Sequence, residues 1–134
     1  MTDIFVGRLM SSPVETVSPE ASAQRAARAM VENGIGSVIV TDGTGHAAGI
    51  LTSTDFVRLG ADGTSASEVP VSEYMSTELV TTTANAPIEE AAGIMIEEGF
   101  HHLPVVDETE GVIGIVTTTD LTAYLSRAET PSPS

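Results

Sequence analysis

Two short runs place hydroxyl side chains and a carboxylate where an apolar strand is expected to turn into a helix. They are residues 49–55, GILTSTD, and residues 114–120, GIVTTTD. A helix N-terminus presents unpaired N–H groups and the positive end of the helix dipole, so hydroxyls there can bind a phosphate. A carboxylate three residues further on can accept both hydroxyls of a ribose. The same residues can also act as a plain helix cap, with the Asp favoured by the dipole, and this alternative stays open.

Histidines are the other residues that could bind a metal ion or act in catalysis. His101 and His102 are adjacent, and neighbouring residues of a strand point to opposite faces, so they are not expected to share one ion. His46 is expected in a turn. The chain has no cysteine, and no Ser-His-Asp arrangement, P-loop or complete GxGxxG is visible. We therefore predict no metal site and no catalytic constellation, and the chain is not expected to be an enzyme.

The net charge of the chain limits the classes of partner that it can bind. The 134 residues include 19 acids and five arginines but no lysine, which gives a formal net charge of −14, and aromatic residues make up only 4%. Nucleic acids and anionic membranes attract basic patches, and single-stranded nucleic acid also needs aromatic platforms, so neither partner is expected. The acidic start, with no long apolar run after it, predicts a cytoplasmic protein without signal peptide or spanning helix.

The dispersed acidic surface resembles that of proteins from salt-loving microbes. Molar salt shortens the Debye length to about 3 Å and would suppress the mutual repulsion of such a surface. The alternative is an ordinary acidic protein.

The chain repeats itself at an offset of 65 residues. Residues 10–60 and 75–125 align without a gap and are identical at 17 of 51 positions. Unrelated segments would not keep one register through glycines, aspartates and apolar positions together. Two copies are too few for a solenoid, so this tandem duplication predicts two half-domains related by a pseudo-two-fold axis.

Each copy predicts the order strand, helix, strand, strand, helix. The first strand is rich in β-branched residues, and the first helix shows apolar residues at spacings of three and four, with methionines and alanines expected in the core. A glycine follows that helix, as is common at helix ends. The expected segments are strands 14–17, 37–41 and 48–51 with a helix from 53 in the first copy, and strands 79–82, 103–106 and 112–116 with a helix from 118 in the second.

These segments divide the chain into two domains, a linker and a tail. Gly, Ser and Ala are frequent between the copies, and the chain ends in Pro-Ser-Pro-Ser. The expected boundaries are domain 1 at 6–60, a linker at 61–73, domain 2 at 74–125 and a flexible C-terminal tail at 126–134.

Landmarks at matching places in both copies carry a family resemblance. They are Met10 and Met75 at the start of each motif, Gly34 and Gly99 after the helices, GFHHLPVVD at 99–107, and the turns ending in Asp55 and Asp120. With these landmarks the repeated unit resembles the cystathionine-β-synthase (CBS) domain, and residues 6–125 resemble a stand-alone CBS-domain pair. The resemblance implies an α/β (α+β) fold, each copy β-α-β-β-α, with two clefts between the copies.

In many members of that family the clefts hold adenosyl compounds such as AMP, ADP, ATP or S-adenosylmethionine. The resemblance implies that the two aspartates take ribose hydroxyls, that Thr52 and Thr117 contact phosphate, and that the first strands border the base. His101 and His102 stand where other members often carry basic residues, whereas the first copy has Gly36 and Ser37, so the clefts are expected to differ in affinity. The ligand-binding residues implied are Thr16, Val17, Ser37, Thr52, Thr54, Asp55, Thr81, Thr82, His101, His102, Pro104, Thr117, Thr119 and Asp120.

Departures from the family pattern bear on the ligand. Ser12 and Thr77 stand where members often carry a basic residue. A polyphosphate approaching a chain of charge −14 needs arginine, Mg²⁺ or high salt, and Arg8 and Arg58 are the nearest candidates by sequence. AMP, or the cationic sulfonium of S-adenosylmethionine, faces less repulsion than ATP.

Three functions stay open at this stage. The first is a regulatory module that binds an adenosyl ligand and modulates an unidentified protein partner. The second is a ligand-free module for homodimerisation or protein interaction, built on the helix faces. The third, an enzyme of small-molecule chemistry, lacks a supporting constellation. No required cofactor is expected, although Mg²⁺ could accompany ATP.

Overall fold

The computed structural model describes residues 4–12 and 14–129. These residues form two compact units, each described by itself below. Unit 1 combines residues 4–12 with residues 80–129, and unit 2 consists of residues 14–79. The fold is mixed α and β, and no helix within the described ranges has the length and apolarity that a bilayer span requires.

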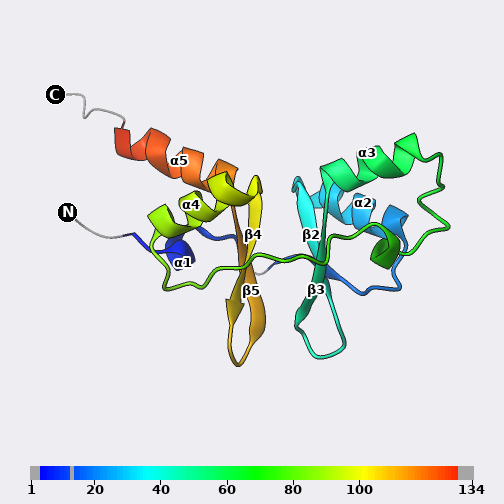
Figure 1. The fold of residues 1–134 in the computed structure, drawn as a ribbon, viewed down its shortest axis with the longest axis horizontal. Helices are drawn as coiled ribbons and strands as arrows, with labels where there is room; N and C mark the ends of the chain where they lie inside the picture. The colour runs from blue at the N-terminus through cyan, green and yellow to red at the C-terminus, as the bar shows by residue number, and fades with distance from the viewer. Residues whose placement is uncertain (1–3, 13, 130–134) are drawn as a thin grey trace. The chain divides into compact units, whose positions relative to one another are not determined.

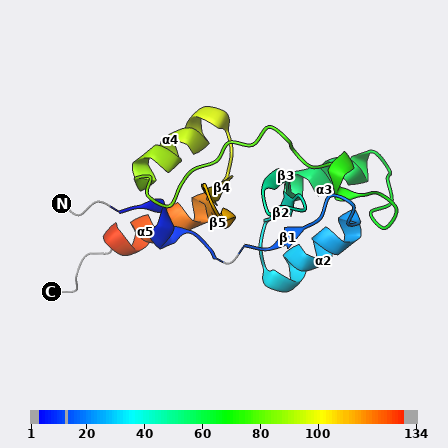
Figure 2. The ribbon, with the colours of Figure 1, turned by 90° about the horizontal axis from the view of Figure 1, so that it is seen from below.

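Unit 2 is a small sheet with two helices on one of its faces (Figures 1 and 2). The strand order is β1-β2-β3, with β1 parallel to β2 and β2 antiparallel to β3. Because the helices cover one face, their apolar stripes meet the inward side chains of β2 and β3. The elements are β1 (Thr16–Val17), α2 (Ala23–Asn33), β2 (Ser37–Thr41), β3 (Ala47–Thr52), α3 (Ser53–Ala61) and the short 3₁₀ helix η1 (Val71–Glu73).

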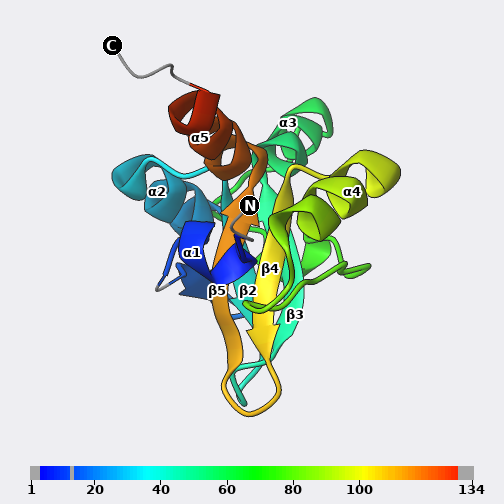
Figure 3. The same cartoon turned by 90° about the vertical axis from the view of Figure 1, so that its left-hand side faces the viewer.

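Unit 1 repeats this plan around an antiparallel hairpin. In Figure 3 its β4–β5 hairpin extends past the helices that cover one of its faces. The register shifts after Val105, at the repeat equivalent of the shift after Val40 in unit 2. The elements are α1 (Val6–Leu9), α4 (Ile88–Glu98), β4 (His102–Asp107), β5 (Gly111–Thr117) and α5 (Thr118–Glu129). Helix α5 therefore continues past residue 126, where the tail was expected to begin, and residues 130–134 lie outside the described part of the chain.

The first strand of the second copy is shorter than predicted. Within residues 79–82 only Thr82 pairs with β4, through a parallel bridge to Val105. In unit 2 the N–H of Ile39 donates to the carbonyl of Glu15 at 3.2 Å. The residue equivalent to Ile39 is Pro104, which has no N–H, so this ladder bond cannot form in unit 1.

The first helix of each copy begins and ends as its sequence indicates. Ser22 caps α2 by accepting the backbone N–H of Arg25 at 3.1 Å, and Gly34 ends the helix with φ of 63°. Pro87 is the N-cap residue of the equivalent helix α4, and Gly99 ends that helix with φ of 73°. Glycine suits both ends because a left-handed backbone strains residues that carry a Cβ.

The predicted core residues of these helices are confirmed. Ala26 and Ala91 are fully buried, and Met30 and Met95 are 7% and 4% exposed. Each contributes to the apolar core of its own unit, against β2 in unit 2 and β4 in unit 1. These side chains therefore stabilise the fold of each unit.

The compact units do not coincide with the repeats, because each repeat's leading segment packs on the other repeat. Ser11 pairs with Ile115 through backbone hydrogen bonds of 2.8 and 3.1 Å, and Ser76 pairs with Ile50 through bonds of 3.0 and 2.9 Å. The leading segments also carry α1 and η1, neither of which was predicted. The stretch expected to be a linker contributes buried residues to the core of unit 2, namely Val69 and Val71.

Two glycines make room for these leading segments. A Cβ on Gly49 would lie 2.6 Å from the sulfur of Met75 and 2.9 Å from the carbonyl oxygen of Ser76. A Cβ on Gly114 would lie 2.7 Å from the sulfur of Met10 and 2.8 Å from the carbonyl oxygen of Ser11. The thioether can move, but the carbonyl is held by the strand pairing.

We therefore predict that Gly49→Ala and Gly114→Ala each lower the free energy of unfolding by about 1–3 kcal/mol, as overpacking does elsewhere. Gly93→Ala is the matched control, because its methyl group meets no atom within 4 Å and Ala is the better helix former, by up to about 1 kcal/mol. Urea denaturation of the three variants measures the difference. Equal stability of Gly49→Ala and Gly93→Ala would contradict the close-approach explanation.

Candidate functional site

The strand-to-helix joint has the same hydrogen bonds in both units. In unit 2 an Asp55 oxygen accepts the backbone N–H of Thr52 at 2.8 Å, within a capping box. In unit 1 an Asp120 oxygen accepts the backbone N–H of Thr117 at 2.8 Å and its hydroxyl at 3.0 Å, while the Thr117 hydroxyl accepts the N–H of Asp120 at 3.1 Å. The capping interpretation of these motifs is therefore correct, and each Asp is fixed at the end of its sheet.

A second backbone hydrogen bond links each strand-to-helix joint to the residue that precedes β2 or β4. The N–H of Ser53 donates to the carbonyl of Gly36 at 3.3 Å, and the N–H of Thr118 donates to the carbonyl of His101 at 3.0 Å. Across the hairpins Ser37 pairs with Thr52, and His102 pairs with Thr117. The expected residues from two distant segments of each repeat thus meet at one end of each sheet.

The two carboxylates differ in their surroundings. Asp55 is only 4% exposed, and its second oxygen accepts from the guanidinium of Arg58. Asp120 is half-buried, and Ala123 occupies the position equivalent to Arg58. Among the described residues no cation lies within salt-bridge distance of Asp120. Arg58, expected as a candidate for binding phosphate, is therefore engaged by a carboxylate of its own helix, while Arg8 is exposed on α1.

Thr82 brings an unpartnered hydroxyl into unit 1. Its backbone N–H donates to the carbonyl of Pro104 at 3.0 Å, and it is 5% exposed. Within the described ranges its Oγ1 has no hydrogen-bond partner, although a buried hydroxyl normally has one. The equivalent residue of unit 2 is Val17, which is buried and apolar. The other expected residues, Thr16, Thr54, Thr81 and Thr119, are exposed.

His102 supplies a second unpartnered atom. It is half-buried at the start of β4, and its buried Nδ1 lacks a hydrogen-bond partner among the residues described. Burial, and then the neighbouring His101, lower the pKa of His102 below its ordinary value of 6.5, and the charge of Asp120 opposes this shift. The neutral form of the ring is therefore favoured in the folded chain. The repeat equivalent in unit 2, Ser37, is buried and does not titrate.

The remaining histidines occupy the places expected of them. His46 lies in the β2–β3 turn, where its Nδ1 is 2.6 Å from the hydroxyl of Thr44, and His101 is exposed before β4. Within the parts of the chain that the structure describes, no three His, Asp or Glu side chains gather as a metal site requires.

Two features of the site were not predicted from the sequence. One is the ion pair of Asp55 with Arg58, for which the i, i+3 spacing on a helix was the available signal. The other is the leading segment that pairs with the last strand of each unit, β3 or β5. Only the three-dimensional contacts reveal this pairing.

The buried neutral state of His102 predicts a pH dependence of stability. Because the unfolded chain takes up a proton on this ring at higher pH than the folded chain, the stabilisation present above pH 6.5 is lost as the pH falls below it. Chemical denaturation from about pH 7.5 to 5.5 should show wild type losing more stability than His102→Asn. His101→Asn should lose an intermediate amount of stability, because burial still lowers the pKa of His102 while the neighbouring histidine no longer contributes. Parallel curves for wild type and His102→Asn would contradict the assignment.

Comparison with known proteins agrees with this architecture. The family model for the CBS domain matches residues 6–62 and again 71–127. The CBS domain-containing protein YhcV of Bacillus subtilis is 38% identical over 113 residues, which cover 84% of this chain and 79% of that protein. An uncharacterized protein of Methanopyrus kandleri is 34% identical over 122 residues, covering 90% of this chain but only 62% of the relative.

The fold is also found in a solved structure with ligands. The CBS domain pair of protein MJ0100, in complex with 5′-methylthioadenosine and S-adenosyl-L-methionine, has a TM-score of 0.89 and 25% sequence identity. The match covers 96% of this chain and all of that one, 100%. Together with the duplicated capped joint and the two family-model matches, these relatives show that the chain belongs to the CBS-domain family and is a tandem pair of CBS domains.

Proposed function

We propose that the chain is a regulatory module that senses an adenosyl ligand. The observation that carries this proposal is its likeness, over 96% of the chain, to a CBS domain pair solved with 5′-methylthioadenosine and S-adenosylmethionine. The geometry of unit 1 supports it, because Asp120, Thr82 and His102 offer polar atoms without partners among the described residues. In this proposal Asp120 accepts the ribose hydroxyls, and Thr82 and Pro104 border the base.

Charge selects among adenosyl ligands. The chain carries a formal charge of −14, and the guanidinium of Arg58 is already paired. 5′-Methylthioadenosine is uncharged, and S-adenosylmethionine carries a sulfonium cation. The negative charge of the chain therefore repels neither ligand, whereas it repels the phosphates of AMP and ATP. We infer that the uncharged and cationic ligands bind more tightly than the nucleotides. ATP requires Mg²⁺ or molar salt to bind at all.

Regulation follows if ligand binding shifts the equilibrium between two states of the module. A ligand can do so only by as much as its affinities for the two states differ. A protein partner that prefers one state then binds the module with a different affinity when the ligand is present, and the partner changes the affinity for the ligand by that same factor, because coupling is reciprocal. Contacts of Asp120 and His102 with a ligand would supply that difference in affinity.

Homodimerisation is the second candidate role, and exposed apolar residues favour it. Val31 and Ile96, at equivalent positions of α2 and α4, are 81% and 82% exposed, and Val57 on α3 is 71% exposed. Exposed apolar side chains mark an interface where they gather into a contiguous patch. Assembly and ligand sensing are compatible, since a dimer of CBS pairs could leave the ligand sites accessible.

The dimer proposal predicts that Val31→Ser with Ile96→Ser shifts the chain from dimer to monomer. The reason is the loss of apolar area that would be buried at the interface. Light scattering coupled to size-exclusion chromatography measures the mass, and Val112→Ser, which changes a half-buried residue of β5, is the control. A wild-type chain that is monomeric at all concentrations would contradict the dimer.

The ligand proposal predicts that isothermal titration of wild type gives a binding signal with 5′-methylthioadenosine or S-adenosylmethionine, and weaker signals with AMP and ATP. Asp120→Asn should weaken binding about 10- to 100-fold, the effect of losing a hydrogen bond to a charged group, while keeping an acceptor for the cap. Glu108→Gln, which removes an exposed charge from the β4–β5 turn, should bind as wild type does. Titrations in both dilute and molar KCl separate a salt requirement from absence of binding. No heat from any of the four ligands in either buffer would contradict the proposal.

A further inference from the structure

We propose that only one of the two repeats is open to an adenosyl ligand, and that Arg58 closes the other by occupying the carboxylate of Asp55. This inference rests on the proposed function and specifies which repeat performs it. The open site is that of the second repeat, in unit 1, and each chain binds one ligand.

The carboxylate of Asp55, in unit 2, is fully engaged by neighbouring groups. One oxygen of Asp55 accepts the backbone N–H and the hydroxyl of Thr52, at 2.8 and 3.4 Å, and the other accepts from Arg58. Both oxygens of Asp55 therefore already accept hydrogen bonds, and neither is left free for a ribose hydroxyl. A ligand could reach this carboxylate only by displacing Arg58, which would leave a buried charge without its cation, a costly change.

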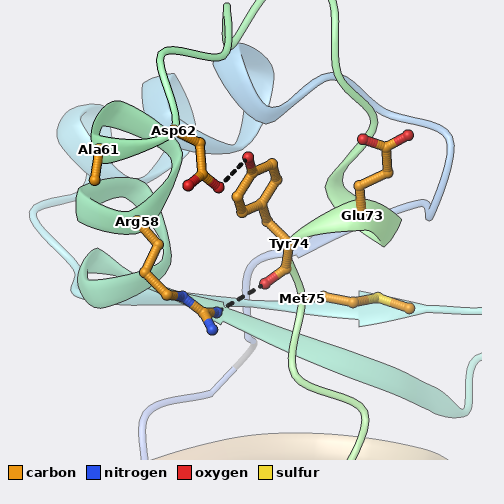
Figure 4. Close-up of a pocket in the computed structure, with 6 residues that line it drawn as sticks. All are labelled: Arg58, Ala61, Asp62, Glu73, Tyr74 and Met75. Carbon is orange, nitrogen blue, oxygen red and sulfur yellow. Dashed lines mark hydrogen bonds between the residues drawn. The ribbon is translucent and has the colours of Figure 1, made fainter.

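Arg58 also contacts the segment that follows η1. Figure 4 shows its guanidinium directed toward the backbone carbonyl of Tyr74, at 3.5 Å. The Tyr74 hydroxyl donates to Asp62 at 2.8 Å and lies 3.0 Å from the hydroxyl of Thr64. Tyr74 follows η1, which is hydrogen-bonded to the rest of unit 2. The carbonyl that contacts Arg58 therefore belongs to a segment that is fixed within the unit. The closure therefore involves the segment that leads into the second repeat.

The second repeat lacks both the arginine and the tyrosine of this arrangement. Ala123 replaces Arg58, and Leu9 stands at the position equivalent to Tyr74. One oxygen of Asp120 serves the cap, and the other has no partner within the described part of the chain. The buried hydroxyl of Thr82 and the Nδ1 of His102 likewise lack partners there.

Unit 1 differs from unit 2 in more than the missing arginine, because it also has buried polar atoms without hydrogen-bond partners among the described residues. Thr82 is 5% exposed, so water outside the fold does not satisfy its hydroxyl, and a buried polar group without a bond is unfavourable. Unit 2 has Val17 and Ser37 at the equivalent positions. A ligand with hydrogen-bonding groups therefore has partners to satisfy in unit 1 and none of this kind in unit 2.

Exchanging the residues at the two equivalent positions tests the inference. Ala123→Arg should install the closure in unit 1 and weaken binding of 5′-methylthioadenosine at least about 10-fold, since an acceptor is lost. Thr122→Arg adds the same charge at the neighbouring, exposed position of α5 and should bind as wild type does. Arg58→Gln should add a second, weaker binding event, and Arg25→Gln, the same charge change on α2, should not.

Isothermal titration of the full chain with 5′-methylthioadenosine gives both stoichiometry and affinity, and circular dichroism checks that each variant is folded. We expect one site per chain in wild type and two in Arg58→Gln. Two equal sites in wild type, unchanged binding in Ala123→Arg, or a single site in folded Arg58→Gln would overturn the inference while leaving the proposed function intact. If Arg58→Gln does not fold, two measurements still test the inference. They are the number of ligands bound by wild type and the difference in affinity between Ala123→Arg and Thr122→Arg. Absence of binding in wild type would overturn the proposed function itself.

Discussion

The hydrogen bond between the backbone N–H of a strand-ending threonine and the carboxylate three residues later organises each unit of this protein. At 2.8 Å in both units, it ends a strand and starts a helix without an intervening loop. The helix dipole adds to it, because the carboxylate lies in the first turn. This constraint fixes the position of Asp55 and Asp120 at the sheet ends, so the chemistry of each repeat depends on what else those carboxylates contact.

The joint occurs in both repeats, but the surroundings of its carboxylate differ between them. With 19 acids and five arginines, the chain has few cations, and Arg58 forms the one arginine–carboxylate ion pair found in the described residues. That pair makes Asp55 a structural carboxylate, whereas Asp120 keeps an oxygen available beside a neutral His102. The two repeats of one fold therefore differ at the carboxylate, which among the described residues is paired with arginine in unit 2 and not in unit 1.

Much of the fold could be predicted from the sequence because the signals are local. Helix-ending Gly34 and Gly99, the apolar spacing around Met30 and the repeat register all rest on neighbours along the chain. The packing of Met10 on Gly114 could not be predicted, since it joins segments far apart in sequence and depends on space rather than on pattern. For the site, the positions of the aspartates were evident, but the unequal environments of the two carboxylates depend on burial and on one arginine.

A crystal structure of the chain grown with 5′-methylthioadenosine tests the central claim most directly, because it identifies the carboxylate that holds the ligand. The account predicts one ligand per chain, with its ribose hydroxyls within hydrogen-bond distance of Asp120 and the Asp55–Arg58 pair intact. A ligand bound to Asp55 with Arg58 displaced, or a ligand that contacts neither carboxylate, would contradict it.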